Sequence, residues 1–466
     1  MSFQRDQKIV RIENGLLKAV AINGQPSVRL NLFDRMVFYH VPGISIAVIK
    51  DGKIVWKRSY GVTNAETKVP VSTETLFQAA SISKTVTAVA ALRTVEQGLL
   101  SLDEDVNPKL TSWKIPENKF TREKKVTLRR LLSHSAGVNQ HGFEGYVNKE
   151  GVVIPSVVQI LNGGASTNSN SIVVNRVPGE EFSYSGGGYT IVQQLLMDIF
   201  HLPFSEIINQ AVILPVSMER SFFQQPLNAE SSANACVGHR SNGAIIEGGR
   251  NIYPELAAAG LWTTPSDLAK FAIEVMNAFN GKSNRVLTQQ MATEMLTVQM
   301  APYGLGFAIE GKGADLEFYH GGGNEGFRCM LVAYPEKNAG IVIMSNSDNG
   351  LQLIAEILRS AAMEYSWPHL SAVKEKIWNK NVSPTVYDQY IGSYSEGSII
   401  LTISKVGDKI FASVNSVNND ENSEPPIEIR PESNEIFFDV EVGREIVFTK
   451  DGMILDSKME LKKMVF

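Results

Sequence analysis

Alternation and clustering of apolar residues predict how the fold begins. Residues 44–49 and 53–60 are β-rich runs, and Asp51-Gly52 between them suits the positive φ of a tight hairpin turn. The run SISKTVTAVAALRTVEQ at residues 81–97 is apolar on most faces, and Gly98 after it suits the left-handed end of a helix. The pattern predicts two antiparallel strands followed by a helix at the centre of the fold.

Helical periodicity dominates residues 100–300, where the patterns VTLRRLLSHSAG, YTIVQQLLMDIF and TTPSDLAKFAIEVMNAF occur. Strand patterns then return in LGFAIE, DLEFYH, FRCMLVAYP and AGIVIMSNS, before an amphipathic helix in LQLIAEILRSAAMEY. Strands at both ends with helices between them predict one antiparallel sheet, flanked by helices and interrupted by a large, mainly helical insertion. We therefore expect an α/β fold of the α+β type.

The C-terminal part has a different pattern. Short alternating runs such as SIILTISK, KIFASVN and EIVFTK are separated by glycine-containing turns, which predicts a small antiparallel β-barrel. A segment that mixes Pro, Ser, Asn and Lys precedes these runs and is typical of a linker. The expected organisation is a leader at residues 1–35, a main domain at 36–366, a linker at 367–384 and the barrel at 385–466.

Length and charge narrow the class of protein. A chain of 466 residues exceeds the size at which one core usually stops growing, and 43% hydrophobic with 20% charged residues is ordinary for a globular protein. The formal net charge of −5 is spread along the chain without the basic stripe that nucleic acid binding requires. We expect no nucleic acid partner.

The N-terminal segment predicts neither a signal sequence nor a membrane span. In MSFQRDQKIVRIENGLLKAV, a charge interrupts every short apolar run, so we expect a cytoplasmic protein. The only two cysteines, Cys236 and Cys329, lack the paired spacing of a zinc site. Buried free thiols are the favoured interpretation, and we expect no metal and no cofactor.

Ser81 and Lys84 form the first candidate site. They lie three positions apart at the start of the central helix, so both side chains can project from one face. A serine needs a base to become a nucleophile, and burial can lower the pKa of a lysine until it serves as one. The spacing alone is a weak signal, because Ser371 and Lys374 repeat it in the linker, where no buried helix is evident.

Two glycine-rich elements follow. Phe182–Tyr189 reads FSYSGGGY, in which Tyr184 could move a proton between nucleophile and leaving group. The alternative is a glycine-rich turn before a helix at 189–200, with Tyr184 simply packed. Phe318–Phe327 reads FYHGGGNEGF, whose glycines on an edge strand expose N–H groups to an oxyanion, and whose His320 holds a carboxylate if protonated or orients the site if neutral. The alternative there is a hairpin connection with a structural histidine.

Other motifs in the chain lie in a structural context that does not suit their function or are missing altogether. Gly321, Gly323 and Gly326 match the dinucleotide pattern G-x-G-x-x-G, but a strand pattern follows where that motif needs a helix. The chain contains neither H-E-x-x-H nor G-x-S-x-G, which disfavours a zinc peptidase and an α/β-hydrolase.

Together the three elements resemble the serine β-lactamase and penicillin-binding-protein superfamily, in the branch of class C β-lactamases, D-peptidases and related esterases. Their order is similar to that family's Ser-x-x-Lys, Tyr-x-Asn and Lys/His-x-Gly boxes. The resemblance covers about residues 36–365, since Leu131–Gly137 and Gly260–Leu268 also look like family blocks. The tail from Tyr387 resembles the start of the lipocalin-like barrel found after some members.

The resemblance implies roles for the candidate residues. Ser81 would be the nucleophile, Lys84 its base partner, Tyr184 the proton shuttle and His320 the residue of the third box. The N–H groups of Ser81 and Gly323 would form the oxyanion hole, with Gly322 beside them.

One departure from the family pattern matters. Gly186 stands where the family usually has an asparagine that binds the acyl-amide group of the substrate. Loss of that donor can cost about 1–3 kcal/mol of recognition. We expect a serine acyl hydrolase acting on a small molecule or short peptide, whether a β-lactam, a D-amino-acid peptide or a small ester, with homo-oligomerisation left open. The alternative is a low-turnover penicillin-binding or scaffold protein that assembles through its barrel.

Overall fold

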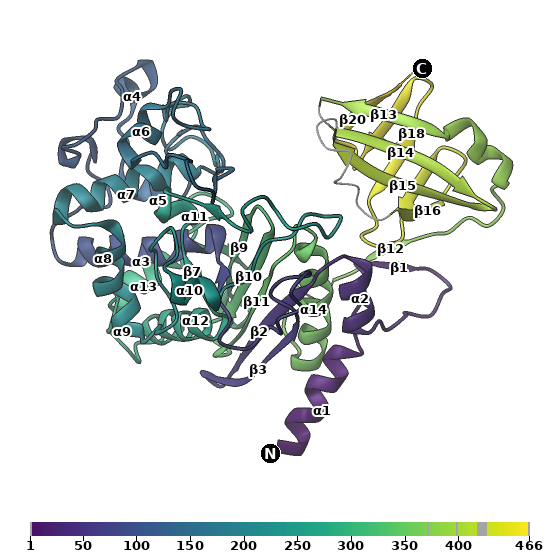
Figure 1. Cartoon of the computed structure of the whole chain (residues 1–466), viewed down its shortest axis with the longest axis horizontal. Helices are drawn as coiled ribbons and strands as arrows, with labels where there is room; N and C mark the ends of the chain where they lie inside the picture. The colour runs from purple at the N-terminus through teal and green to yellow at the C-terminus, as the bar shows by residue number, and fades with distance from the viewer. Residues whose placement is uncertain (1, 371, 398, 417–425, 465–466) are drawn as a thin grey trace. The chain divides into compact units, whose positions relative to one another are not determined.

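The computed structural model describes residues 2–370, 372–397, 399–416 and 426–464, and its main sheet is antiparallel (Figure 1). The strand order is β3-β2-β11-β10-β9-β8. These strands are β2 (Gly43–Lys50), β3 (Lys53–Gly61), β8 (Ala308–Glu310), β9 (Glu317–Asn324), β10 (Phe327–Tyr334) and β11 (Ala339–Ser345). The first and last thirds of the main region thus build one sheet, as the sequence predicts.

The chain divides into two compact units. The first, named here the sheet unit, comprises Pro42–His239 and Ile245–Gly350. The second, named the barrel unit, comprises Met1–Val41, Arg240–Ala244 and Leu351–Phe466.

The predicted hairpin and central helix are both confirmed in the sheet unit. Asp51 and Gly52 have φ values of 53° and 68°, as a tight turn between right-twisted strands requires. The helical run begins with a 3₁₀ turn at Ala80–Ile82, continues as α3 (Ser83–Glu96) and ends at Gly98, whose φ is 74°. The side chains of α3 are buried along nearly its whole length.

The insertion between the sheet halves is helical, as expected. It contains α4 (Lys119–Glu123), α5 (Leu128–Leu132), α6 (Val157–Asn162), α7 (Gly186–Phe200), α8 (Phe204–Ile208), α9 (Leu214–Val216), α10 (Ala229–Ala233), α11 (Leu256–Ala259), α12 (Pro265–Phe279) and α13 (Gln289–Met295). Two short strand pairs also form, β4 (Phe77–Gln78) with β7 (Trp262–Thr263) and β5 (Tyr146–Val147) with β6 (Asn251–Ile252). Helix α12 packs across the sheet, against β2, β3, β10 and β11.

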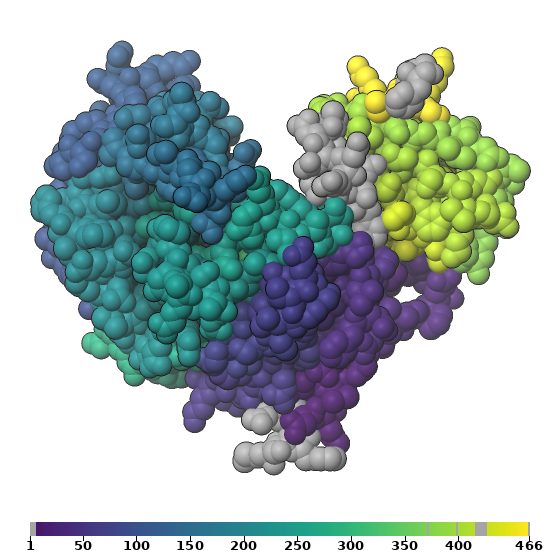
Figure 2. Space-filling view, viewed as in Figure 1, coloured from purple at the N-terminus to yellow at the C-terminus, as the bar shows by residue number. Residues whose placement is uncertain are grey.

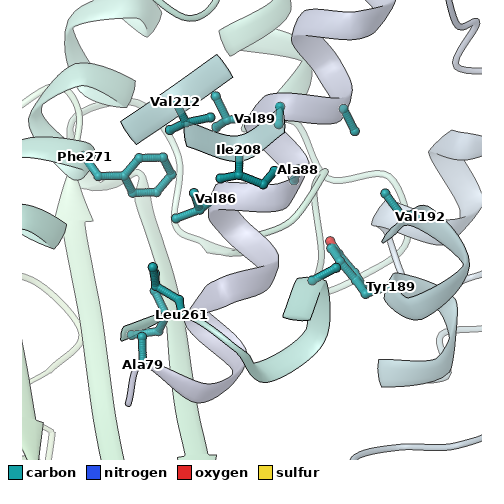
Figure 3. Close-up of a cluster of buried hydrophobic side chains, with 14 of the residues drawn as sticks. Ala79, Val86, Ala88, Val89, Tyr189, Val192, Ile208, Val212, Leu261 and Phe271 are labelled. Carbon is teal, nitrogen blue, oxygen red and sulfur yellow. The ribbon is translucent and has the colours of Figure 1, made fainter. Parts of the chain in front are cut away.

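Helix α3 lies at the centre of the hydrophobic core. Figure 3 shows Val86 and Val89 of α3 among Ile208, Val212 and Phe271, all of them buried. Burial of such side chains is the main favourable contribution to folding, and it fixes α3 from several sides. The first turn of α3 is therefore a rigid place for reactive groups.

The barrel unit contains a closed eight-stranded antiparallel barrel, which confirms the predicted barrel. Its strands follow chain order: β13 (Gly392–Glu396), β14 (Ile399–Val406), β15 (Lys409–Ser416), β16 (Ile427–Pro431), β17 (Ile436–Asp439), β18 (Glu445–Phe448), β19 (Gly452–Leu455) and β20 (Met459–Lys463). Buried side chains that include Tyr394, Phe437, Phe448 and Met453 pack together as its core.

The predicted linker is partly ordered into a strand. Lys374–Lys376 forms β12, which pairs in parallel with β1 (Val20–Ile22) of the leader. Lys374 is exposed on this strand, and Ser371 lies outside the described residues. The second Ser-x-x-Lys spacing thus has no buried helix around its lysine.

The leader also contains α1 (Ser2–Glu13) and α2 (Leu32–Phe38), and α2 carries a buried arginine. The Arg35 guanidinium makes two hydrogen bonds to Glu356 of α14 (Gly350–Tyr365), at 2.7 and 2.9 Å, and also pairs with Glu441. Lys18 lies 2.6 Å from Glu441, so two cations face two carboxylates. This cluster joins the leader, α14 and the β17–β18 connection within the barrel unit.

Two further features concern the surface of the sheet unit and the length of its apolar helices. In the space-filling view, the blue segments of the insertion form part of the exposed face of the sheet unit (Figure 2). Within the described ranges, no single helix is long and apolar enough to cross a membrane, and one bent pair, Gly186–Phe200 with Phe204–Val216, passes on length and composition only. Residues of that pair belong to the hydrophobic core.

Candidate active site

Ser81 sits in a strained turn at the start of the central helix. The preceding Ala80 has a φ of 48°, a left-handed conformation that is unfavourable for a residue with a side chain and costs about 1–3 kcal/mol. Two bonds hold the turn: the Ala79 N–H donates to the Leu261 carbonyl at 2.9 Å, and the Cys329 thiol donates to the Ala79 carbonyl at 3.0 Å. Both cysteines are buried free thiols, as predicted.

Lys84 contacts Ser81 directly. Its Nζ lies 2.9 Å from the Ser81 Oγ and 2.7 Å from the carbonyl oxygen of Ala258. Only 2% of Lys84 is exposed, and burial lowers its pKa from the ordinary 10.5 to about 7. A large fraction of this amine is therefore neutral near pH 7 and able to accept a proton.

Tyr184 is the third side chain at the nucleophile. Burial raises the pKa of its phenol well above the ordinary value, and a hydrogen bond with Ser81 acts in the opposite direction but is the smaller effect. Lys84 Nζ lies 5.2 Å from the centroid of the Tyr184 ring. The phenol thus stays protonated at neutral pH, so it begins as a proton donor rather than as a phenolate.

His320 comes from β9 and is neutral. Its Nδ1 lies 2.6 Å from the carbonyl oxygen of Gly321, and since a carbonyl only accepts, Nδ1 carries the proton. Its Nε2 is buried without a hydrogen-bond partner among the described residues. Burial, followed by the charge of Lys84, lowers the pKa of His320 to about 3. Of the two roles that the sequence allows, binding a carboxylate as a cation is the less compatible with this environment.

Gly322 allows β9 to approach the Ser81 turn. A Cβ at this position would lie 2.3 Å from the Ala79 carbonyl oxygen and 2.4 Å from the Cys329 Sγ, closer than any side chain tolerates. Strand β9 pairs with β8 over Glu317–Tyr319 and no further. The segment from His320 to Asn324 therefore has no β8 neighbour on that side. In this segment, the backbone N–H groups of alternate residues point away from β10, toward the edge that β8 leaves open, and Gly323 stays the predicted oxyanion donor.

The glycine run after Tyr184 is helical, which corrects the alternative interpretation of a glycine-rich turn before a helix at 189–200. Gly186–Gly188 form the first turn of α7 and do not make a turn before it, and the side chain of Ser185 caps the helix by accepting from the Gly188 N–H at 2.9 Å. A Cβ on Gly186 would lie 3.1 Å from the His141 carbonyl oxygen and 3.1 Å from the Phe143 ring. The Cβ of an asparagine would therefore make tight contacts, and the neighbouring loop would have to shift to accept it.

Two aromatic residues near the site carried no functional assignment from sequence. His134 lies with its ring centroid 4.1 Å from that of Tyr184, and Tyr303 contacts His134 and His320 at 5.0 and 6.0 Å. His134 belongs to the family-like block at Leu131–Gly137, which could have drawn attention to it. Tyr303 stands in a loop with no sequence signal.

This chain is similar to known proteins in sequence and in fold. Residues 30–362 match the Beta-lactamase family. Protein flp of Staphylococcus aureus (strain MRSA252) is 24% identical over 317 residues, which are 66% of this chain and 60% of flp. The chain thus covers less than two thirds of the length of that curated relative.

Two solved structures are similar in fold. The octameric penicillin-binding protein homologue from Pyrococcus abyssi aligns with a TM-score of 0.60 at 20% identity, over 92% of this chain and 97% of the homologue. The D-amino acid amidase from Ochrobactrum anthropi SV3, complexed with L-phenylalanine amide, aligns with a TM-score of 0.59 at 18% identity, over 77% of this chain and 99% of the amidase. At these identities the likeness concerns the fold.

Proposed function

Because this chain belongs to the Beta-lactamase family, we propose that it is a serine hydrolase that forms an acyl-enzyme on Ser81. The observation that carries the proposal is the contact of 2.9 Å between Ser81 and Lys84, an amine whose pKa burial lowers to about 7. A serine hydroxyl next to a neutral amine in a dry site is the arrangement that activates a nucleophile.

The reaction has two steps. In the first, neutral Lys84 accepts the Ser81 proton while the oxygen attacks a carbonyl carbon, and the N–H groups of Ser81 and Gly323 stabilise the oxyanion. The Tyr184 phenol gives its proton to the leaving amine or alcohol as that bond breaks, and Lys84 returns a proton to Tyr184. In the second step, water attacks the acyl-enzyme and gives a proton to the same pair. The bond between the carbonyl carbon and the Ser81 oxygen then breaks, the pair returns the proton to that oxygen, and the acid leaves.

The substrate is an amide or ester, and two features of the site narrow it. Neutral His320 presents no positive charge to a substrate carboxylate, and Gly186 offers no side-chain amide to an acyl-amide group. Both features disfavour β-lactams and peptides with a free C-terminal carboxylate. Small esters and amides, including D-amino-acid amides of the kind that the Ochrobactrum relative's name indicates, fit better.

We assign the chemistry to residues 36–366 and place the lipocalin-like segment at 385–466 outside the reaction. A homologue from Pyrococcus abyssi is octameric, and this supports self-association of the present chain. A low-turnover scaffold of the same fold is the second candidate, and the crowded position of Gly186 favours it.

The test combines a labelling experiment with a substrate panel. A fluorophosphonate probe should label the wild type and should leave Ser81→Ala unlabelled, with both proteins showing the same thermal unfolding. Labelling of the variant at the wild-type rate contradicts the assignment. Nitrocefin, p-nitrophenyl esters and D-amino-acid anilides then separate the candidates, since a scaffold fails on all three.

A further inference from the structure

His134 forms hydrogen bonds with the residues on both sides of Tyr184. Its carbonyl oxygen accepts the Ser183 N–H at 2.7 Å, and its ring Nδ1 accepts the Ser185 N–H at 3.1 Å. The ring itself lies against the Tyr184 ring, at 4.1 Å between centroids and 31° between planes. His134 therefore holds the backbone on both sides of Tyr184 and packs against one face of the Tyr184 ring.

The backbone of His134 is shaped for this double contact. Its φ of 56° is left-handed, which is uncommon for a residue with a side chain and is tolerated best by Asn, Asp and His. Such a conformation persists only where the surroundings hold it.

The ring of His134 can play this part only when neutral. Because Nδ1 accepts from a backbone N–H, its proton sits on Nε2, which is buried without a partner among the described residues. Burial is the main cause that lowers the pKa of His134 well below the ordinary value, and the electrostatic interaction with Lys84 acts in the same direction. A second proton would sit on Nδ1. The ring N–H and the Ser185 N–H would then face each other as two donors.

We propose that His134 is a positioning residue that holds the Tyr184 phenol at the Ser81 hydroxyl during acyl transfer, an inference that rests on the proposed function. His134 acts through Tyr184, since its ring bonds to the neighbouring backbone and stacks on the phenol. A phenol that drifts from the leaving group still leaves Lys84 in place to activate Ser81. The loss should therefore be greatest for substrates whose leaving group needs a proton.

The experiment is a double-mutant cycle of His134→Asn, Tyr184→Phe and the double variant in the full chain. Phenyl acetate, with a poor leaving group, and p-nitrophenyl acetate, with a good one, serve as probes. Asparagine keeps the left-handed backbone accessible and removes the ring. His134→Asn should lower kcat/KM, which reports acylation, by about tenfold or more for phenyl acetate and by several-fold less for p-nitrophenyl acetate.

The decisive comparison is between Tyr184→Phe and the double variant. If His134 works through the phenol, the double variant is no slower than Tyr184→Phe, within about twofold. If the two losses in kcat/KM multiply, or if His134→Asn lowers kcat/KM equally for both esters, the positioning role is wrong. Full activity in Tyr184→Phe or Ser81→Ala would instead overturn the proposed function, so the two failures are distinguishable.

His239→Asn is the matched control. His239 is also buried, and its ring bonds to the Asn346 carbonyl at 2.8 Å and to the Ala65 N–H at 3.1 Å. This variant tests the general effect of removing a buried imidazole. Its effect on kcat/KM should combine multiplicatively with that of Tyr184→Phe, and a multiplicative result for His134→Asn as well would refute the coupling.

Discussion

The Lys84 amine lies 2.9 Å from the Ser81 hydroxyl oxygen, and only 2% of the lysine is exposed. Its pKa of about 7 gives acylation a defined pH dependence. Only the neutral amine accepts the proton, so the rate of fluorophosphonate labelling should rise as pH increases through about 7 and then level off. Labelling that is independent of pH between 5 and 9 would show that Lys84 is not the base.

Lys84→Arg should replace this base with a side chain that stays positively charged. A guanidinium stays protonated at every accessible pH, so labelling should fall by about 10²–10⁴-fold and lose its rise near pH 7. Stopped-flow or gel-based labelling rates across pH provide the measurement, and the unfolding curve of each variant serves as the folding control.

Gly322→Ala should impair both labelling and stability. Its Cβ would lie 2.3 Å from the Ala79 carbonyl oxygen, so β9 must move away from the Ser81 turn. Overpacking of this kind costs about 1–3 kcal/mol or more. Gly321→Ala is the control for unfolding free energy, because the nearest neighbour of its Cβ would be the end of the flexible Met330 side chain, at 3.4 Å. Equal loss of stability in the two variants would contradict this description.

Restoring the family's asparagine at Gly186 should not create an amide-binding site. The new side chain would displace the loop at His141 and Phe143, so Gly186→Asn should lose about 1–3 kcal/mol of unfolding free energy and gain no activity on D-amino-acid anilides. Gly188→Ala, in the same helical turn, should be tolerated because its nearest neighbour would be at 3.5 Å. A stable Gly186→Asn variant with improved KM would refute the steric explanation.

Glu255 should make the protein less stable as pH rises. Both of its carboxylate oxygens lack a hydrogen-bond partner among the described residues, and burial raises its pKa from 4.5 to about 8. Between these values the folded state binds more protons than the unfolded state, so unfolding free energy falls with pH. The difference between wild type and Glu255→Gln should change by about 1 kcal/mol per pH unit from pH 5 to 8. Parallel curves for the two proteins in chemical denaturation would exclude this effect.

Arg35→Met should destabilise the barrel unit. It leaves Glu356 and Glu441 without their shared buried cation, a loss of about 3–5 kcal/mol. Lys57→Met removes an exposed pair with Glu74 and should cost at most about 1 kcal/mol. Calorimetry of both variants tests the difference, and Ser81 labelling reports on the sheet unit separately. A similar small effect in both variants would contradict the importance of the cluster.

The sequence by itself determined the elements that depend on local pattern. Alternation, turn glycines and one continuous apolar run predicted the hairpin at Asp51-Gly52, the helix that contains Lys84 and the barrel, because side-chain period and backbone permissiveness act over a few residues. The three-residue spacing placed Ser81 and Lys84 on one face for the same reason. The roles of Tyr184, His320 and Gly323 stay predictions for the experiments above.

Only the tertiary structure decided which groups meet and in what protonation state. The Ala258 carbonyl, the His134 ring and the loop against Gly186 come from segments far apart in the chain, so no local pattern reports them. The pKa of Lys84 and the neutral state of His320 follow from burial by those segments, since a charge loses its hydration only when the whole fold closes around it.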